Sequence, residues 1–315
     1  MTTLLPSPTR EYRNHHLDST RWRAFQPRED DIVVTTSYKS GTTWMQQILH
    51  LLIFKGTPDA LPVGLVSPWI DARFQAPLEE VVAGIEAQTH RRFVKSHLPL
   101  DGLPYYPQVK YVVVGRDARD VFMSFWNHYR NYTDDLMERL NDRTGWSGDS
   151  LPDPPAEDAI HKAWREWMTR GWFAWESEGW PFWSNLHHTR TYWPYRDLDN
   201  ILLFHYSDML VDLRGQITRL AEYLGFELTE EELERIAKAA SFDQMKKDFK
   251  PMDGLLRAAF KGGSDAFIFK GTNGRWRDVL TAGDLALYET AKERVLTPGC
   301  AAWLEEGWLA GKASN

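Results

Sequence analysis

The residues best suited to chemistry in this 315-residue chain lie in one short segment, Ser37 to Trp44. The segment follows an apolar run and precedes a stretch in which apolar residues recur at helical spacing. Gly41 permits a close approach of the backbone to a ligand, and the free N–H groups at a helix start favour an anion. Lys39 adds a positive charge, and Thr42 and Thr43 add hydroxyl donors. The segment therefore predicts a phosphate-binding loop.

Two other interpretations of this loop remain open. It can be an ordinary strand-to-helix turn capped by Ser40 or Thr42. It can also be compared with a nucleoside-triphosphate loop, which places a lysine directly after its last glycine and then a hydroxyl for Mg²⁺. Here Lys39 precedes Gly41, so the order of residues disfavours a metal-bound triphosphate, and we expect no metal site.

The elements that must position this loop follow from the hydrophobic pattern. Four short apolar runs are predicted to be buried strands, and amphipathic stretches between and after them are predicted to be helices. The strands are expected at residues 31–36, 92–95, 110–115 and 201–205, and the helices from residue 42, over Ala118–Tyr129 and on to about Ala240. This α/β alternation predicts a central parallel sheet flanked by helices, with ligand-binding loops at the carboxyl ends of the strands.

No linker separates two hydrophobic cores, so residues 1–315 are expected to form one domain with a core over about 25–298. Residues 132–158 hold eight acidic and two basic residues and are predicted to be a lid-like surface insertion. Residues 250–275, rich in glycine and lysine, are predicted to be a second mobile loop. The polar tail from about Ala310 is expected to be frayed.

Composition excludes several classes of protein. The net charge is −7 and no polybasic run occurs, which disfavours nucleic acid as a partner. The single cysteine, Cys300, cannot form an internal disulfide and fits a reducing compartment. The first residues lack the apolar core of a signal peptide, and no stretch is long and apolar enough to predict a membrane span. We therefore expect a cytoplasmic protein.

Five segments together resemble the cytosolic sulfotransferase family, whose members use 3′-phosphoadenosine-5′-phosphosulfate as sulfuryl donor. A match of one segment alone is weak evidence, but these five segments occur in the family's order and at compatible spacing between about residues 31 and 281. They are Tyr38–Trp44, Val94–Pro99, Val114–Val121 with Ser124, Ser241-Phe242 with Met245–Lys247, and Lys270-Gly271 with Gly274–Arg277. The resemblance implies the sulfotransferase fold, which is related to that of P-loop nucleotide-binding proteins.

The resemblance also implies a role for each matching residue. Lys39 would neutralise the leaving group, Lys95 would assist near the sulfuryl group, and His97 would be the general base. An imidazole, with an ordinary pKa of about 6.5, suits the removal of a hydroxyl proton at neutral pH. Arg116 would hold the donor's 3′-phosphate together with Ser124, which we also count among the catalytic residues. The other expected donor contacts are Ser40, Gly41, Thr42, Thr43, Trp44, Phe242, Lys270 and Gly271, with Trp44 and Phe242 around the adenine.

Non-functional interpretations exist for several of these residues. Lys95 can be a solvated lysine at a strand end, and Arg116 can be paired with Asp117 or Asp120. Trp44 can be an ordinary core residue, as aromatic residues at helical spacing often are.

The chain departs from the family pattern at Tyr38, where the family usually has proline, and at two further places. Phe269 stands where the C-terminal signature has an arginine, so one cationic contact to the 3′-phosphate is absent or replaced. Arg257 and Lys261 are candidates for the replacement. In the family's dimerisation patch Arg277 and Thr281 fit, but Ala286 occupies the acidic position. A homodimer is possible, but not one formed by that patch.

Tryptophan is concentrated between residues 126 and 193, where the family builds part of its acceptor pocket. Aromatic surface suits a small apolar or aromatic acceptor, although Trp164, Trp167, Trp172 and Trp175 can equally pack a helix on the sheet. His187 or His188 is a candidate for contact with the acceptor, whose reactive group would be a hydroxyl or an amine.

The sequence thus predicts a sulfotransferase that leaves 3′-phosphoadenosine 5′-phosphate as product. The alternatives are a non-catalytic nucleotide-binding protein and a metal-dependent small-molecule kinase.

Overall fold

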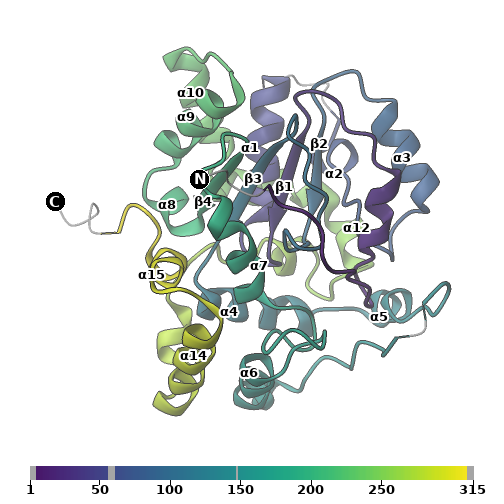
Figure 1. The fold of residues 1–315 in the computed structure, drawn as a ribbon, viewed down its shortest axis with the longest axis vertical. Coiled ribbons are helices and arrows are strands. Elements are labelled where there is room, and N and C mark those ends of the chain that lie inside the picture. The colour runs from purple at the N-terminus through teal and green to yellow at the C-terminus, as the bar shows by residue number, and fades with distance from the viewer. Residues whose placement is uncertain (1–4, 56–60, 147, 311–315) are drawn as a thin grey trace.

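The computed structural model describes residues 5–55, 61–146 and 148–310, and it is built around a four-stranded sheet (Figure 1). The strands are β1 (Ile32–Thr36), β2 (Phe93–Ser96), β3 (Lys110–Gly115) and β4 (Ile201–His205). They lie in the order β2-β1-β3-β4, and every neighbouring pair is parallel. The predicted strands and the parallel sheet are therefore confirmed. Because the chain order reverses around β1, the loops that follow the strands diverge and leave a crevice at their carboxyl ends.

Helices cover both faces of the sheet (Figure 1). Successive strand residues point to opposite faces, and both sets are apolar, as a sheet buried on two sides requires. Ile32 and Val34 pack in one core with α1 (Thr42–Phe54), α9 (Leu213–Leu224) and α10 (Glu230–Ala239). The other core contains Val33 and Val94. Its helices are α4 (Ala118–Arg130), α6 (Ile160–Thr169), α7 (Asn185–Tyr192), α14 (Ala282–Val295) and α15 (Pro298–Glu306).

Shorter elements complete the structure. The α-helices are α2 (Val63–Val66), α3 (Leu78–Glu86), α5 (Asp134–Leu140), α8 (Tyr206–Val211), α11 (Phe242–Asp248), α12 (Asp253–Arg257) and α13 (Gly263–Phe267). The 3₁₀ turns are η1 (Ser19–Ala24), η2 (Glu157–Ala159), η3 (Trp193–Tyr195), η4 (Lys250–Met252) and η5 (Arg275–Asp278). In the described ranges, no helix has the length and apolar character needed to cross a membrane.

The sequence analysis predicted a surface insertion at residues 132–158. The structure shows that part of this segment is a helix packed on the core. The segment contains α5, whose Leu136 and Leu140 are buried in the core. The Thr133 hydroxyl accepts a hydrogen bond from the Leu136 N–H and caps this helix. Acidic residues in the first turn of a helix interact favourably with the helix dipole. Part of the negative charge in this segment, which suggested a loop, therefore lies at the start of a helix.

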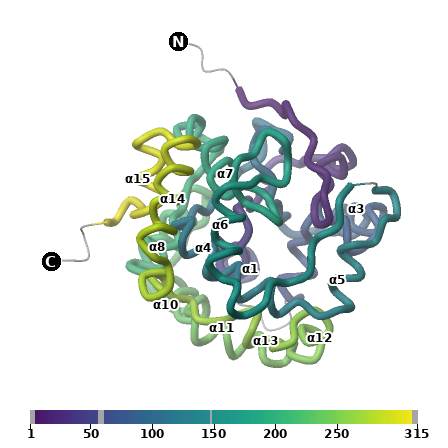
Figure 2. The backbone as a smooth tube through the Cα atoms, turned by 90° about the horizontal axis from the view of Figure 1, so that it is seen from below, coloured from purple at the N-terminus to yellow at the C-terminus, as the bar shows by residue number. Residues whose placement is uncertain are grey.

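The segment 250–275 is also more ordered than predicted. It forms η4, α12 and α13, and in Figure 2 α11, α13 and α12 follow one another along one edge of the molecule. The Asp253 carboxylate accepts hydrogen bonds from the Ser264 N–H and hydroxyl, both at 2.8 Å, and joins α12 to α13. Phe260 is buried and pairs with Tyr132 in an isolated bridge. One contact within the segment and one with a distant residue, neither of which composition reveals, hold the glycine-rich segment in place.

The tryptophan-rich stretch divides into two parts. Trp164 and Trp167 lie on α6 and are fully buried, as expected for a helix packed on the core. The helix ends at Thr169, however, so Trp172 and Trp175 do not share its face. Beyond Ala310, the tail that was expected to be frayed lies outside the described residues.

Candidate active site

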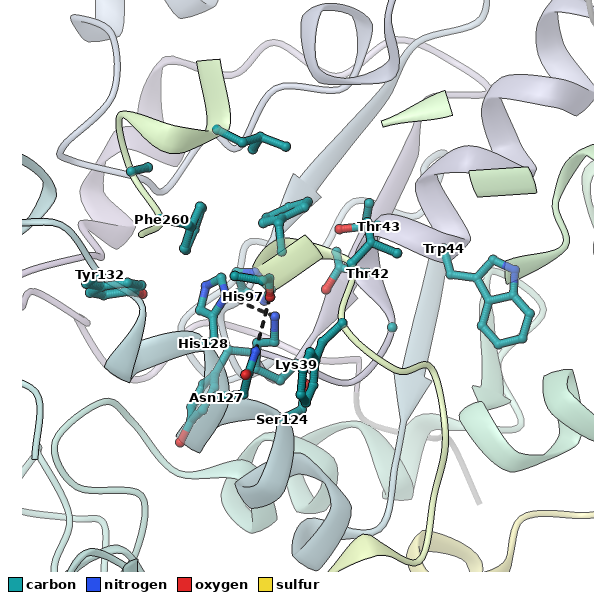
Figure 3. Close-up of a pocket in the computed structure, with 18 of the residues that line it drawn as sticks. Lys39, Thr42, Thr43, Trp44, His97, Ser124, Asn127, His128, Tyr132 and Phe260 are labelled. Atoms are coloured by element: carbon teal, nitrogen blue, oxygen red, sulfur yellow. Dashed lines mark hydrogen bonds between the residues drawn. The ribbon is translucent and has the colours of Figure 1, made fainter. Parts of the chain in front are cut away.

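A cavity of about 500 Å³ opens at the carboxyl ends of the strands (Figure 3). Residues that follow each strand line it: Lys39 and Gly41 after β1, His97 after β2, Arg116 after β3 and Tyr206, the first residue of α8 (Tyr206–Val211), after β4. The cavity also receives side chains from α4, α11 and the 255–271 segment. Its position is the one expected for the ligand site of an open parallel sheet.

The predicted phosphate loop leads into a helix whose first turn has no side-chain cap. Gly41 is the N-terminal cap of α1 with a φ of 108°, and no side chain caps the helix. A Cβ on Gly41 would lie 2.8 Å from the Tyr206 ring, so only glycine fits there. The Ser40 hydroxyl bonds to that of Ser37 at 2.8 Å, is fully buried and does not line the cavity. The interpretation as a side-chain-capped turn is therefore wrong, and the free N–H groups of α1 are available to an anion.

His97 is held in one tautomer. Its Nδ1 lies 2.8 Å from the backbone oxygen of Thr36, and because a carbonyl only accepts, Nδ1 carries the proton. Nε2 is left with its lone pair and has no hydrogen-bond partner among the described residues. Burial, followed by the nearby Lys95 charge, holds the pKa of His97 well below its usual value. The ring is therefore neutral at physiological pH and able to accept a proton.

Two lysines bring positive charge into the same cavity. Lys39 Nζ donates to His128 Nδ1 at 3.2 Å, the contact drawn in Figure 3. Lys95 Nζ lies 4.5 Å from the centre of the Trp69 ring, so it is not a solvated lysine at a strand end. Burial lowers the pKa of Lys39 to about 7, with help from the Arg116 charge, and lowers the pKa of Lys95 to about 8. A bound anion would restore the charged form of both.

Arg116 lines the cavity and joins two of its walls. Its guanidinium donates to Asn273 Oδ1 at 2.8 and 3.0 Å, to the Thr272 oxygen at 3.1 Å and to the Lys39 oxygen at 3.2 Å. It is paired with neither Asp117 nor Asp120. Asp117 binds Arg119, and Asp120 accepts from the Gly274 N–H. The Ser124 hydroxyl, on α4, faces the same cavity without a hydrogen-bond partner in the described residues.

The predicted aromatic contacts lie beyond the phosphate loop. Trp44 donates from Nε1 to the Ala240 oxygen at 2.7 Å, and its ring stands edge-on to Tyr206 with centroids 5.3 Å apart. Gly271 packs against Phe242 so closely that a Cβ would lie 2.3 Å from the ring. Apart from Ser40, every residue predicted for the donor site or for catalysis lines this one cavity, namely Lys39, Gly41, Thr42, Thr43, Trp44, Lys95, His97, Arg116, Ser124, Phe242, Lys270 and Gly271.

Four other candidates do not reach the cavity. His187 Nε2 lies 2.9 Å from Asp101 Oδ2, and His188 Nε2 lies 3.2 Å from the Thr35 hydroxyl, so both imidazoles are engaged within the core. Neither lines the site. Arg257 is paired with Asp253 at 2.7 Å, and Lys261 lies 4.0 Å from Asp134. Neither of these cations therefore replaces the arginine absent at position 269.

Sequence reasoning missed much of the far end of the cavity. His128 lies four residues after Ser124, one helical turn along α4, and that spacing could have identified it. Arg275 lies in one of the segments that resemble the sulfotransferase family, but the resemblance implied no role for it. The remaining lining residues gave no local signal, because they come from distant parts of the chain. They include His16, Trp69, Phe74, Asn127, Tyr132, Phe182, Phe260 and Phe267, whereas Trp183 belongs to the tryptophan-rich stretch for which an acceptor wall was predicted.

Comparisons with known proteins agree on one family. The model of the sulfotransferase domain matches residues 29–295. A glycolipid sulfotransferase of Mycobacterium bovis is 33% identical over 308 residues, covering 94% of each chain. Sulfotransferase 1A1 of Bos taurus is 27% identical over 278 residues, covering 84% of this chain and 83% of the relative. A solved structure of retinol dehydratase with androsterone and the inactive cofactor PAP has a TM-score of 0.64 and 25% identity, and the match covers 87% of this chain and 82% of that one.

Proposed function

Because the chain belongs to the sulfotransferase family, we propose that it transfers a sulfuryl group from 3′-phosphoadenosine-5′-phosphosulfate to a hydroxyl of an amphiphilic small molecule. The observation that carries this proposal is the neutral His97 ring. Its free Nε2 shares one cavity with Lys39, Lys95 and the uncapped start of α1. A base, two cations and an anion cradle are the parts that transfer of an anionic group to a hydroxyl requires.

Two features of the cavity support such a donor. The uncapped α1 start suits the 5′-phosphosulfate, and Trp44 and Phe242 offer aromatic surface to a base. Across the described ranges, no group of three or more His, Cys, Asp or Glu side chains is arranged to hold a metal ion. The lining includes Lys39, Lys95 and Arg116, together with Arg139, Lys270 and Arg275, and the proposed reaction relies on cationic side chains of this kind.

In the proposed mechanism each residue has a separate task. The donor supplies a sulfuryl group attached to a phosphate leaving group. His97 Nε2 takes the hydroxyl proton as the acceptor oxygen bonds to sulfur and the bond from sulfur to the phosphate oxygen breaks. Lys39 stabilises the charge that develops on the phosphate, and Lys95 stabilises the sulfuryl oxygens. One such electrostatic contact is worth on the order of 10²–10³ in rate.

Two imidazoles at the acceptor end have complementary hydrogen-bonding capacity. The charged form of Lys39 can only donate to His128 Nδ1, and burial holds the pKa of His128 well below its usual value, so beside a charged Lys39 the neutral ring carries its proton on Nε2. His97 therefore offers a lone pair, whereas His128 offers a donor. An acceptor with a second oxygen near the reacting hydroxyl could donate a hydrogen bond to His97 from the hydroxyl and accept one from His128 at the second oxygen.

The rest of the acceptor end is apolar. Trp183, Phe260 and Phe267 line it, and the exposed Leu255 lies at its rim. A polar end beside an apolar wall suits an amphiphile with a hydroxylated head, and the mycobacterial relative is named for a glycolipid substrate. We therefore propose a hydroxylated amphiphile as acceptor, of which a glycolipid is one example.

Calorimetric titration with 3′-phosphoadenosine 5′-phosphate, with ATP–Mg²⁺ as comparator, tests the donor class. The proposal expects metal-independent binding of the bisphosphate and transfer of labelled sulfate from the donor to an alkyl glycoside. Preferential binding of ATP–Mg²⁺ would support a kinase instead. Binding of the bisphosphate without transfer to any hydroxylated amphiphile would support a non-catalytic nucleotide-binding protein.

A further inference from the structure

Arg275 brings an unpaired positive charge to the nucleotide end of the cavity. It begins η5 and lines the cavity beside Phe269, with its guanidinium 5.3 Å from the centre of that ring. Within the described ranges it makes no hydrogen bond and no ion pair, and its buried Nε is unsatisfied. Arg116, by contrast, has protein partners for both Nη atoms and for Nε. An unsatisfied buried polar group is costly, so its presence requires an explanation.

The electrostatic surroundings of Arg275 favour an anion. Burial and the neighbouring Arg116 both lower its pKa, while Asp120 is the acidic group that opposes them. The Asp120 carboxylate is itself buried and has a pKa raised to about 6. One such carboxylate does not balance Arg116, Arg275 and Lys39 together. Cations held close without enough counter-charge form a site that a dianionic phosphate would complete.

We propose that Arg275 binds the 3′-phosphate of the donor nucleotide and supplies the cationic contact that Phe269 cannot make. This inference rests on the proposed function. The uncapped start of α1 and Lys39 serve the 5′ side of the nucleotide, leaving Arg275, Arg116 and the free hydroxyl of Ser124 for a second phosphate. Phe269 lies under the Arg275 guanidinium and keeps it on the cavity wall.

The test compares 3′-phosphoadenosine 5′-phosphate with adenosine 5′-phosphate, which lacks only the 3′-phosphate, by calorimetry. Arg275→Met keeps the length of the stem and removes the charge. It should weaken binding of the bisphosphate about 10- to 100-fold and change binding of the monophosphate by no more than about threefold. Arg277→Met is the matched control, because Arg277 is exposed and lies outside the cavity, and it should change neither affinity.

A thermal melt of the free protein separates a ligand-binding arginine from a structural one. Removing an unpaired cation beside Arg116 should leave the melting temperature of the free Arg275→Met variant unchanged or higher. Equal weakening of both nucleotides, no weakening, or a clearly lower melting temperature would overturn the inference while leaving the proposed function intact. Failure of the wild-type protein to bind the bisphosphate would overturn both.

Discussion

The donor end and the acceptor end of the cavity are built differently. Much of the donor end comes from residues that closely follow strands, such as Lys39, Gly41 and Arg116, and the rest of it, such as Phe242 and Lys270, also lies in short motifs. The acceptor end comes from single side chains far apart in sequence, such as His16 and Phe260. Backbone groups and cations near a helix start suit any molecule with the same phosphates, whereas a wall of separate side chains can be changed one residue at a time.

The largest expected effect is at the residue where the two ends meet. His97→Ala should reduce the transfer rate about 10²–10⁴-fold, because the acceptor proton loses its base. Binding of 3′-phosphoadenosine 5′-phosphate should be nearly unchanged, because the donor contacts remain. Single-turnover transfer and calorimetry measure the two quantities. His90→Ala, a histidine outside the cavity, is the control, and equal transfer rates in the two variants would exclude His97 as the base.

A change at His128 tests whether the acceptor end selects a second oxygen. His128→Phe should lower the ratio of kcat/KM for an alkyl glucoside to that for an alkyl alcohol about 10- to 100-fold, because one buried hydrogen bond to the acceptor is lost. If the substitution also disturbs Lys39, it changes kcat/KM for both acceptors by the same factor, and this change cancels in the ratio.

His16→Phe is the matched control for this experiment. His16 lines the same cavity, but its ring nitrogens lie against His15 and the Tyr132 hydroxyl within the protein. The ratio should therefore stay constant in His16→Phe. An unchanged ratio in His128→Phe would mean that His128 does not bind a second oxygen of the acceptor.

A smaller effect, confined to the donor end, is a dependence of binding on pH. The free protein has Lys39 and Lys95 with pKa values of about 7 and 8, and a bound anion raises both. Binding above neutral pH must therefore take up protons, and the affinity for the bisphosphate should fall about tenfold between about pH 7 and pH 9. Titration in buffers of different ionisation enthalpy measures the uptake. Lys39→Met should have weaker binding but a shallower pH dependence, and an unchanged slope would exclude Lys39 as the titrating group.

The same two lysines affect the stability of the free protein in the opposite direction. Their pKa values in the folded protein lie below those of exposed lysines, so the unfolded chain binds more protons between about pH 7 and pH 10. Stability from this source therefore rises with pH over that range, while affinity for the bisphosphate falls. The contrast distinguishes titration inside the cavity from a general loss of structure at high pH.

The sequence by itself determined the sheet and the residues that gather at the carboxyl ends of its strands. Buried strands are continuous apolar runs, and a parallel sheet places the residues that follow them along one edge, so Lys39, His97 and Arg116 were predictable from motifs next to strands. Gly41 was predictable because a glycine between a strand and a helix permits a close approach of the backbone to a ligand, and the structure adds that a Cβ there would meet the Tyr206 ring.

Only the tertiary structure decided the acceptor end and the pairing of charges. The spacing of residues could not show that His187 and His188 bind Asp101 and Thr35 in the core, or that His128 reaches Lys39 instead. It could not show that Arg275 makes no hydrogen bond or ion pair with any of the described residues. A hydrogen bond or an ion pair depends on where two distant segments meet, and the packing of the whole core, not the local sequence, sets that meeting point.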